Sequence, residues 1–303
     1  MASTAMIASL GPLSLSTPLV AASGTIGSVV EFAAVTDLSA YGAATAKSVS
    51  PVAWPGRAAP RVAPTEAGML NAIGIQNPGI DAWVADIGPQ LSALGVGVIG
   101  SAVGYTVDEY VTVAAKLAGC DLVAIEINLS CPNLEGKGMF ALDSQATADV
   151  VRSVRAAVGL PLGAKLSPNA VDVGEIAAAA AESGADWVTV GNTVWGAAID
   201  IERRQPKISA GIGGYSGAAI KPIAVRCVLE VRQSNPTLPI LGLGGVQSGE
   251  DAIEFMMAGA NAVGIGTAHF GSPKIGRKVL RQMQTWCERH GVSDVQELVG
   301  VAR

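Results

Sequence analysis

Two kinds of segment alternate along this chain. Short apolar runs rich in β-branched residues are each followed by a Gly-rich or polar turn and then by a helical stretch. This order is typical of parallel βαβ units. The pattern predicts strands at 18–22, 43–47, 97–101, 122–128, 162–165, 187–191, 240–244 and 262–266. Eight such runs indicate an α/β fold, a single (β/α)₈ TIM barrel, rather than an open sheet.

Helices are predicted where apolar residues recur with a helical period. The clearest helical stretches are 108–118, 144–158, 173–183, 220–233 and 249–258. Asp108 and Ser144 precede the apolar faces of the first two and are predicted as N-terminal signals. No domain boundary interrupts the alternation, so residues 1–303 are predicted to form one domain.

Three long connections, 48–80, 130–143 and 195–220, are predicted as loops because they contain few periodic residues. Each follows the carboxyl end of a predicted strand, and in a TIM barrel these ends form the active-site face. Loops of this length inside a compact domain are usually functional. We therefore expect the site at this face.

Composition limits the class of protein. The chain is 50% hydrophobic and 15% charged, with a net charge of −5 and no run of Lys or Arg. This balance argues against nucleic acid and against membranes as partners. Residues 1–30 carry no charged side chain, so the basic start of a signal peptide is missing. A cytoplasmic protein is expected.

The cysteines also favour a reducing compartment. They stand at 120, 131, 227 and 287, and no two form a C-x-x-C pair. This spacing does not suit a disulfide framework, a zinc site or an iron–sulfur cluster. The two histidines cannot make a metal site alone, so no metal is expected in this chain.

Polar residues and glycines gather where the predicted strands end. Lys47, Asn128 and Lys165 end three strands, and Asn192-Thr193 follow a fourth. Such a rim suits a bound cofactor and a small polar substrate. Lysines in this position face an anion or form structural salt bridges with rim carboxylates, and the sequence leaves both possibilities open.

The last two predicted strands end in glycines, at 242–245 and 264–266. Backbone N–H groups approach a phosphate closely only where no Cβ intervenes, and this place in a barrel is the usual phosphate site. The alternative is that these glycines only form tight left-handed turns.

The segment 128–133, Asn-Leu-Ser-Cys-Pro-Asn, is the most specific local feature. Cys131 precedes a proline, which favours an extended or turn conformation on a loop. A thiol can accept a proton near neutral pH if its surroundings lower its pKa. A lone cysteine is otherwise a small buried hydrophobe, and that reading suits Cys120, Cys227 and Cys287 better.

These residues resemble the class 1 dihydroorotate dehydrogenase family. Asn-Leu-Ser-Cys-Pro-Asn is similar to the family's catalytic-loop motif, and 69–79, Met-Leu-Asn-Ala-Ile-Gly-Ile-Gln-Asn-Pro-Gly, to its substrate-binding loop. Further matches occur at 22–25, 165–169, 213–217, 220–222, 244–245 and 266–267. The motifs stand in the family's order and extend from about residue 13 to 290.

The resemblance implies an FMN-dependent dehydrogenase in which Cys131 takes the C5 proton of dihydroorotate and hydride passes from C6 to N5 of FMN. The residues implied to hold the pyrimidine and its carboxylate are Lys47, Asn71, Ala72, Ile73, Gly74, Ile75, Asn128, Asn133, Asn192 and Thr193. Those implied to contact FMN are Ser23, Lys47, Ser48, Ser101, Asn128, Lys165, Gly191, Gly217, Gly244, Gly245, Gly266 and Thr267.

The segments 192–200 and 203–206 look more like type B than type A of this family. That likeness implies a partner subunit with FAD and a 2Fe–2S cluster that passes electrons to NAD, in a homodimer or heterotetramer. Ser101 stands where the family usually has Asn, so its contact with FMN would be weaker or water-mediated. Gly191 replaces a usual apolar residue, but a backbone contact there would survive.

Three other functions stay open at this point. One is a related flavin-dependent dihydropyrimidine dehydrogenase acting on uracil or thymine, which lack the carboxylate of orotate. Another is a flavin-free, phosphate-binding barrel lyase or isomerase, and its protein would be colourless. The third is a barrel without activity, against which Cys131 and the two rim lysines argue.

Overall fold

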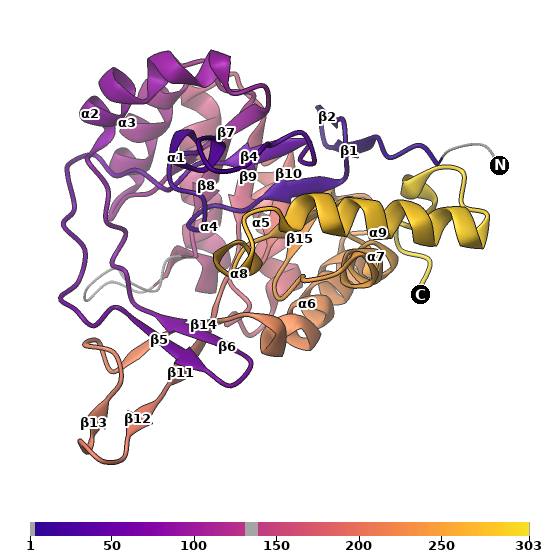
Figure 1. The fold of residues 1–303 in the computed structure, drawn as a ribbon. Coiled ribbons are helices and arrows are strands. Elements are labelled where there is room, and N and C mark those ends of the chain that lie inside the picture. Colours follow the sequence, from indigo (N-terminus) through magenta and orange to yellow (C-terminus); the bar gives the residue numbers. More distant parts are fainter. Residues whose placement is uncertain (1–3, 131–138, 303) are drawn as a thin grey trace.

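The computed structural model describes residues 4–130 and 139–302 (Figure 1). A closed barrel of eight parallel strands forms its centre, which confirms the predicted (β/α)₈ TIM barrel. Around the barrel the strands are β3 (Leu19–Ala21), β4 (Ala43–Thr45), β7 (Gly97–Ala102), β8 (Ala124–Asn128), β9 (Leu162–Lys165), β10 (Trp187–Val190), β15 (Ile240–Leu243) and β16 (Ala262–Ile265). Strand β16 pairs with β3, with Gly264 beside Val20, and this pairing closes the barrel.

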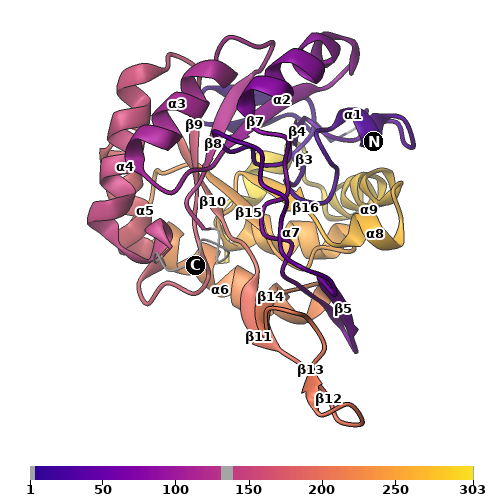
Figure 2. The same ribbon diagram turned by 90° about the vertical axis from the view of Figure 1, so that its left-hand side faces the viewer.

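Helices surround the barrel strands (Figure 2). The α-helices are α1 (Val30–Ala33), α2 (Ile80–Asp86), α3 (Val107–Leu117), α4 (Ser144–Ala157), α5 (Val173–Glu182), α6 (Lys221–Ser234), α7 (Gly249–Ala258), α8 (Ala268–Gly271) and α9 (Ile275–His290). Short 3₁₀ turns are η1 (Gly88–Ala93), η2 (Phe140–Leu142), η3 (Ala218–Ile220) and η4 (Val295–Leu298). Within the described ranges, no helix has the length and apolar character needed to cross a membrane.

Two predicted N-terminal signals are wrong by one or two residues. The N-cap of α3 is Thr106, which accepts a hydrogen bond from the Glu109 N–H, and the N-cap of α4 is Asp143. Asp108 and Ser144 lie in the first turns of these helices. The apolar period locates a helix well, but it does not choose between neighbouring polar residues that can all act as caps.

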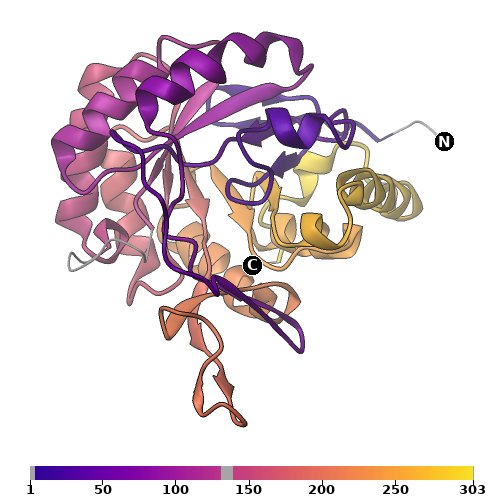
Figure 3. The ribbon, with the colours of Figure 1, turned by 60° about the vertical axis from the view of Figure 1, so that its left-hand side comes forward.

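Parts of the loops predicted at 48–80 and 195–220 are strands. An antiparallel sheet has the order β11 (Val194–Ala197), β14 (Ile212–Ser216), β6 (Gly68–Asn71) and β5 (Val62–Thr65), and β12 (Ile199–Asp200) pairs with β13 (Gln205–Pro206). We call these six strands the arm, which protrudes from the barrel (Figures 1 and 3). Its core is small, with buried Ala63, Leu70, Ala72 and Ile208, so the apolar alternation is too brief to recognise.

Alternate residues of each barrel strand point inward, which divides the barrel interior into layers. The lower layer is apolar and packs against the hairpin of β1 (Ala8–Leu10) and β2 (Leu13–Leu15). Its barrel residues are Val20, Ala43, Ile99, Ala124, Trp187, Leu241 and Ala262. The upper layer is polar and buried: Thr45, Ser101, Glu126 and Thr189 lie two residues beyond lower-layer residues, and Lys165 lies two residues beyond Gly163.

Candidate active site

A pocket lies at the carboxyl ends of the barrel strands, and residues of the arm contribute to its wall. The arm contributes Val62, Met69, Asn71 and Ser216. Most of the site residues predicted from the sequence lie in the same wall: Ser23, Lys47, Ser48, Asn71, Ile73, Ile75, Asn128, Lys165, Asn192, Thr193, Gly217, Gly244, Gly245, Gly266 and Thr267. Residues from nine separate parts of the sequence therefore meet at one pocket.

The other predicted site residues are not part of this wall. Ala72, Gly74, Ser101 and Gly191 are absent from it. Ser101 is buried, and its Oγ lies 2.8 Å from the Ser48 Oγ, so it supports a wall residue instead of reaching the pocket. Cys131 and Asn133 lie outside the described residues.

A chain of hydrogen bonds orients the amides of two pocket asparagines, Asn128 and Asn192. Asn128 Nδ2 donates to Ser48 Oγ at 2.9 Å, and Asn128 Oδ1 accepts from Ser130 Oγ at 3.1 Å. Asn192 Nδ2 donates to Ser130 Oγ at 2.7 Å, and its Oδ1 accepts from the Thr193 N–H at 2.7 Å. Because both ends of each amide are engaged, neither side chain can rotate without losing a bond. The pocket therefore offers preorganised polar groups to a planar ligand.

Lys165 brings a buried cation to the pocket. Its residue exposure is 6%, and among the residues that the structure describes no carboxylate lies within ion-pair distance of its ammonium group. Of the two possibilities that the sequence leaves open for the rim lysines, a structural salt bridge is therefore not found for Lys165 among the described residues. A buried charge without a counter-charge is costly, so the site suits an anionic group of a ligand.

Glu126 lies in the same upper layer and was not predicted as a site residue. Its Oε2 accepts a hydrogen bond from Thr189 Oγ1 at 2.7 Å, and Thr189 Oγ1 in turn accepts from Trp187 Nε1 at 3.3 Å. Its Oε1 is buried and has no hydrogen-bond partner in the described structure. An acid among the apolar residues of 124–127 is the signal in the sequence that indicates it.

Different structural requirements explain the glycines at different positions of the pocket. Gly244 and Gly245 have φ values of 144° and 84°, so for them the alternative of left-handed turns holds. Gly266 has no such φ, and a Cβ built on it would have no atom nearer than 3.9 Å. Neither backbone conformation nor packing requires glycine there. The bare backbone at Gly266 fits the close approach of a ligand such as a phosphate.

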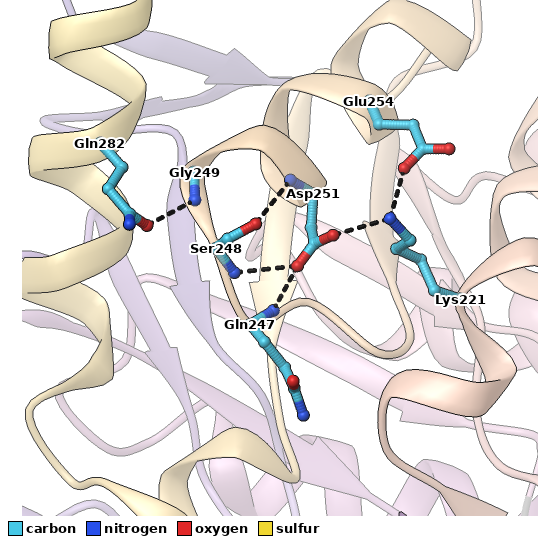
Figure 4. Close-up of polar contacts among 7 residues, drawn as sticks. All are labelled: Lys221, Gln247, Ser248, Gly249, Asp251, Glu254 and Gln282. Atoms are coloured by element: carbon cyan, nitrogen blue, oxygen red, sulfur yellow. Dashed lines mark hydrogen bonds and ion pairs between the residues drawn. The ribbon is translucent and has the colours of Figure 1, made fainter. Parts of the chain in front are cut away.

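Lys221 lies beside the Gly244–Gly245 turn, but its ammonium group forms ion pairs with carboxylates of α7. Its ammonium pairs with Asp251 and Glu254, both at 2.7 Å (Figure 4). Hydrogen bonds to these carboxylates raise the pKa of Lys221. A phosphate at this turn would therefore be held mainly by backbone N–H groups rather than by this lysine.

The carboxylate of Asp251 also holds the loop that follows the turn. Its Oδ2 accepts from the N–H groups of Gln247 and Ser248, each at 2.9 Å, in the capping box of α7 (Figure 4). Burial raises the pKa of Asp251, but the hydrogen bonds from Lys221, Gln247 and Ser248 outweigh burial and lower that pKa overall. Gln247 itself lines the pocket, so this clamp fixes part of the wall.

The sequence of this chain is similar to those of known proteins. The family model described as "Dihydroorotate dehydrogenase" matches residues 7–286. Proteins named "Dihydroorotate dehydrogenase B (NAD(+)), catalytic subunit" are similar over nearly their whole length: 44% identical over 96% of this chain and 95% of the protein from Desulforudis audaxviator, and 42% over 96% of both chains for Bacteroides thetaiotaomicron.

A solved structure is similar in fold. The crystal structure of DHODH from Eimeria tenella in complex with ferulenol has a TM-score of 0.81 and 19% sequence identity, and the match covers 98% of this chain and 88% of that one. At this level of identity the likeness shows a shared fold.

Proposed function

Because the chain belongs to the dihydroorotate dehydrogenase family, we propose that it oxidises dihydroorotate to orotate in the pocket at the barrel mouth. The observation that carries this proposal is the buried Lys165, which has no carboxylate partner among the described residues and lies in one wall with Asn128 and Asn192. A buried cation beside oriented amides suits a flat, anionic, hydrogen-bonding ligand.

The residues present fit FMN. Lys165 would face the part of the flavin where negative charge collects on reduction, and Ser48 and Asn128 would contact the ring. The bare backbone at Gly266, with Thr267 and the Gly244–Gly245 turn, would hold its phosphate. When bound, FMN supplies the acceptor for the hydride that leaves C6 of dihydroorotate.

The substrate would lie between the barrel rim and the arm. Lys47 lines this space and would attract the substrate carboxylate. The amides of Asn71, Asn128 and Asn192, together with Thr193, would fix the plane of the pyrimidine through hydrogen bonds. Orientation of this kind contributes to rate because the reacting atoms are already aligned.

Cys131 is proposed as the base that removes the C5 proton. It lies outside the described residues, so the proposal rests on the sequence motif 128–133. The motif begins at Asn128 and Ser130, and both belong to the hydrogen-bond chain of the pocket. Those contacts support a position of the motif beside the substrate space.

The B-type relatives are named catalytic subunits, which says that those proteins work with a further subunit. We propose that this chain likewise has a partner subunit, that the partner carries FAD and a 2Fe–2S cluster, and that electrons pass through it to NAD⁺. A homodimer or heterotetramer would result. Copurification of a brown iron–sulfur protein with the tagged chain would support this assembly, and NAD⁺ reduction by the chain alone would contradict it.

The proposed reaction is tested with the purified chain alone. We expect flavin absorbance, and orotate formation from dihydroorotate when a dye serves as electron acceptor. Dihydrouracil is the matched control substrate because it lacks only the carboxylate, and we expect it to react at least tenfold more slowly. A colourless protein that does not bind added FMN, or equal rates with both substrates, would contradict the proposal.

A further inference from the structure

His269 lies behind the pocket wall, in α8, and was not assigned a role from the sequence. It is 2% exposed. Its Nδ1 lies 3.0 Å from Thr25 Oγ1 and its Nε2 lies 2.7 Å from the Tyr41 hydroxyl. The ring of Phe32 packs against the imidazole with centroids 4.9 Å apart. Both ring nitrogens are thus engaged in a closely packed site.

The neighbouring bonds settle which nitrogen carries the hydrogen. Thr25 Oγ1 donates to the carbonyl oxygen of Ala22 at 3.0 Å. Its single hydrogen is therefore used, so it must accept from His269, whose Nδ1 is protonated. Burial lowers the pKa of His269 to about 4, which keeps the ring neutral at pH 7. Nε2 is then an acceptor, and the Tyr41 hydroxyl donates to it.

The chain of donors is directional from end to end. Tyr41 donates to His269, His269 donates to Thr25, and Thr25 donates to the carbonyl oxygen of Ala22. Burial raises the pKa of Tyr41, so its hydroxyl keeps the proton that it donates. Every polar group of this buried chain is satisfied in only one arrangement, which makes it rigid.

The last two residues of this series of hydrogen bonds, Thr25 and Ala22, belong to the pocket wall. Two bonds to Thr25 Oγ1 fix the rotation of that side chain, and so they fix the position of its methyl group. The open space above the Gly266 backbone is bordered by that Thr25 methyl and by the Ala22 Cβ, each 3.9 Å from the place a Cβ on Gly266 would occupy. The backbone N–H of His269 also donates to the Gly266 carbonyl oxygen at 2.9 Å.

We propose that His269 is a positioning residue for the phosphate of FMN: its Nδ1–H holds Thr25 in the rotamer that shapes the space over Gly266. This inference rests on the proposed function, because it requires that FMN occupies the pocket. His269 touches neither cofactor nor substrate and acts only through Thr25.

Two substitutions distinguish the contribution of Nδ1, which bonds Thr25, from that of Nε2, which bonds Tyr41. In His269→Asn the amide nitrogen can take the place of Nδ1 and keep the bond to Thr25. In His269→Gln the amide reaches the place of Nε2, keeps a contact with Tyr41 and loses Thr25. His290→Gln is the control, because His290 is the chain's other histidine and is exposed on α9.

The measurement is the affinity of each apoprotein for FMN and for riboflavin, followed by flavin fluorescence. Riboflavin lacks the phosphate, so it reports on the ring site alone. We expect roughly tenfold weaker FMN binding in His269→Gln, unchanged riboflavin binding, and near wild-type affinities in His269→Asn and His290→Gln. Thr25→Val should repeat the selective loss if His269→Gln does not fold.

Three results would overturn the inference. FMN affinity in both His269→Gln and Thr25→Val could equal that of the wild type, or both variants could lose FMN and riboflavin affinity alike. Either result leaves the proposed function intact. If the wild-type apoprotein binds neither flavin, the proposed function fails together with this inference.

Discussion

The lower and upper layers of the barrel interior are built by the same strands, yet they differ in a basic way. The lower layer is closely packed, whereas the upper layer contains polar groups without a partner within the described ranges. In the lower layer the Trp187 indole fills the space beside Gly163, where a Cβ would come within 2.2 Å of its ring. In the upper layer Lys165 has no counter-charge and Glu126 Oε1 no donor among the described residues. Unsatisfied polar groups cost stability and persist where they serve a ligand.

This comparison separates stability from function along single strands. A change in the lower layer should lower the free energy of unfolding and leave ligand binding and turnover largely unchanged. A change in the upper layer should impair ligand binding or turnover and leave the apoprotein as stable as before.

The largest effect is expected at Cys131, the proposed base. Cys131→Ala should lower dihydroorotate turnover by roughly 10²–10⁴-fold because general-base catalysis contributes about that factor. FMN content and melting temperature should stay at wild-type values, and both are measured beside the steady-state rate. Cys120→Ala is the control, since Cys120 is half-buried and is not in the pocket wall. Near-normal turnover in Cys131→Ala would place the base elsewhere.

Next in size is the effect at Trp187 in the lower layer. Trp187→Ala should lower the free energy of unfolding by about 3–5 kcal/mol because it leaves a cavity in a packed core. Urea unfolding of the apoprotein measures this change. Trp195→Ala, at a half-exposed position on the arm, should cost less than about 1 kcal/mol. Equal losses at the two tryptophans would remove the distinction between the layers.

Lys165→Met should show the opposite signature from Trp187→Ala. FMN affinity is expected to fall roughly 10–100-fold, because a hydrogen bond to a charged group is worth about 1.5–3 kcal/mol. The apoprotein should be at least as stable as the wild type, since an uncompensated buried charge is removed. Flavin titration measures the FMN affinity, and urea unfolding measures the stability of the apoprotein. Lys278→Met, at an exposed position, is the control. A less stable apoprotein with unchanged FMN affinity would make Lys165 a structural residue.

How much the sequence could predict also differs between regions of the molecule. The barrel strands were placed within two residues because each has a buried apolar run bounded by turns. The arm was not, because its strands have two to five residues and include Gly and Pro. The rim of the pocket was predictable since a parallel barrel brings its strand ends together.

The support behind the pocket wall could not be predicted in this way. Tyr41 and His269 are 228 positions apart, and nothing in the local pattern of either indicates the other. Glu126 and Thr189 meet across the barrel interior, 63 positions apart. Contacts of this kind follow from closure of the barrel and not from any segment, so only the folded chain shows them.

The smallest effect is expected at Asp251, which supports the pocket from outside the barrel interior (Figure 4). Asp251→Asn keeps the shape of the side chain but loses the charge that pairs with Lys221 and caps α7. The cost should be about 1 kcal/mol, or a decrease of roughly 2–4 °C in melting temperature for a chain of this size. Glu254→Gln should cost less, since Glu254 is about half exposed and, among the described residues, pairs with Lys221 alone.

The pH dependence of that difference tests its cause. The folded pKa of Asp251 is lowered from the ordinary 3.8, so its contribution is fully present above that pH and is lost as the pH falls through the lowered value. The difference in melting temperature between wild type and Asp251→Asn should therefore be constant from pH 7 to pH 5 and shrink below pH 3.8. A difference that persists undiminished into acid would come from the altered amide and not from the charge, and the clamp would then hold the Gly244–Gly245 turn by shape alone.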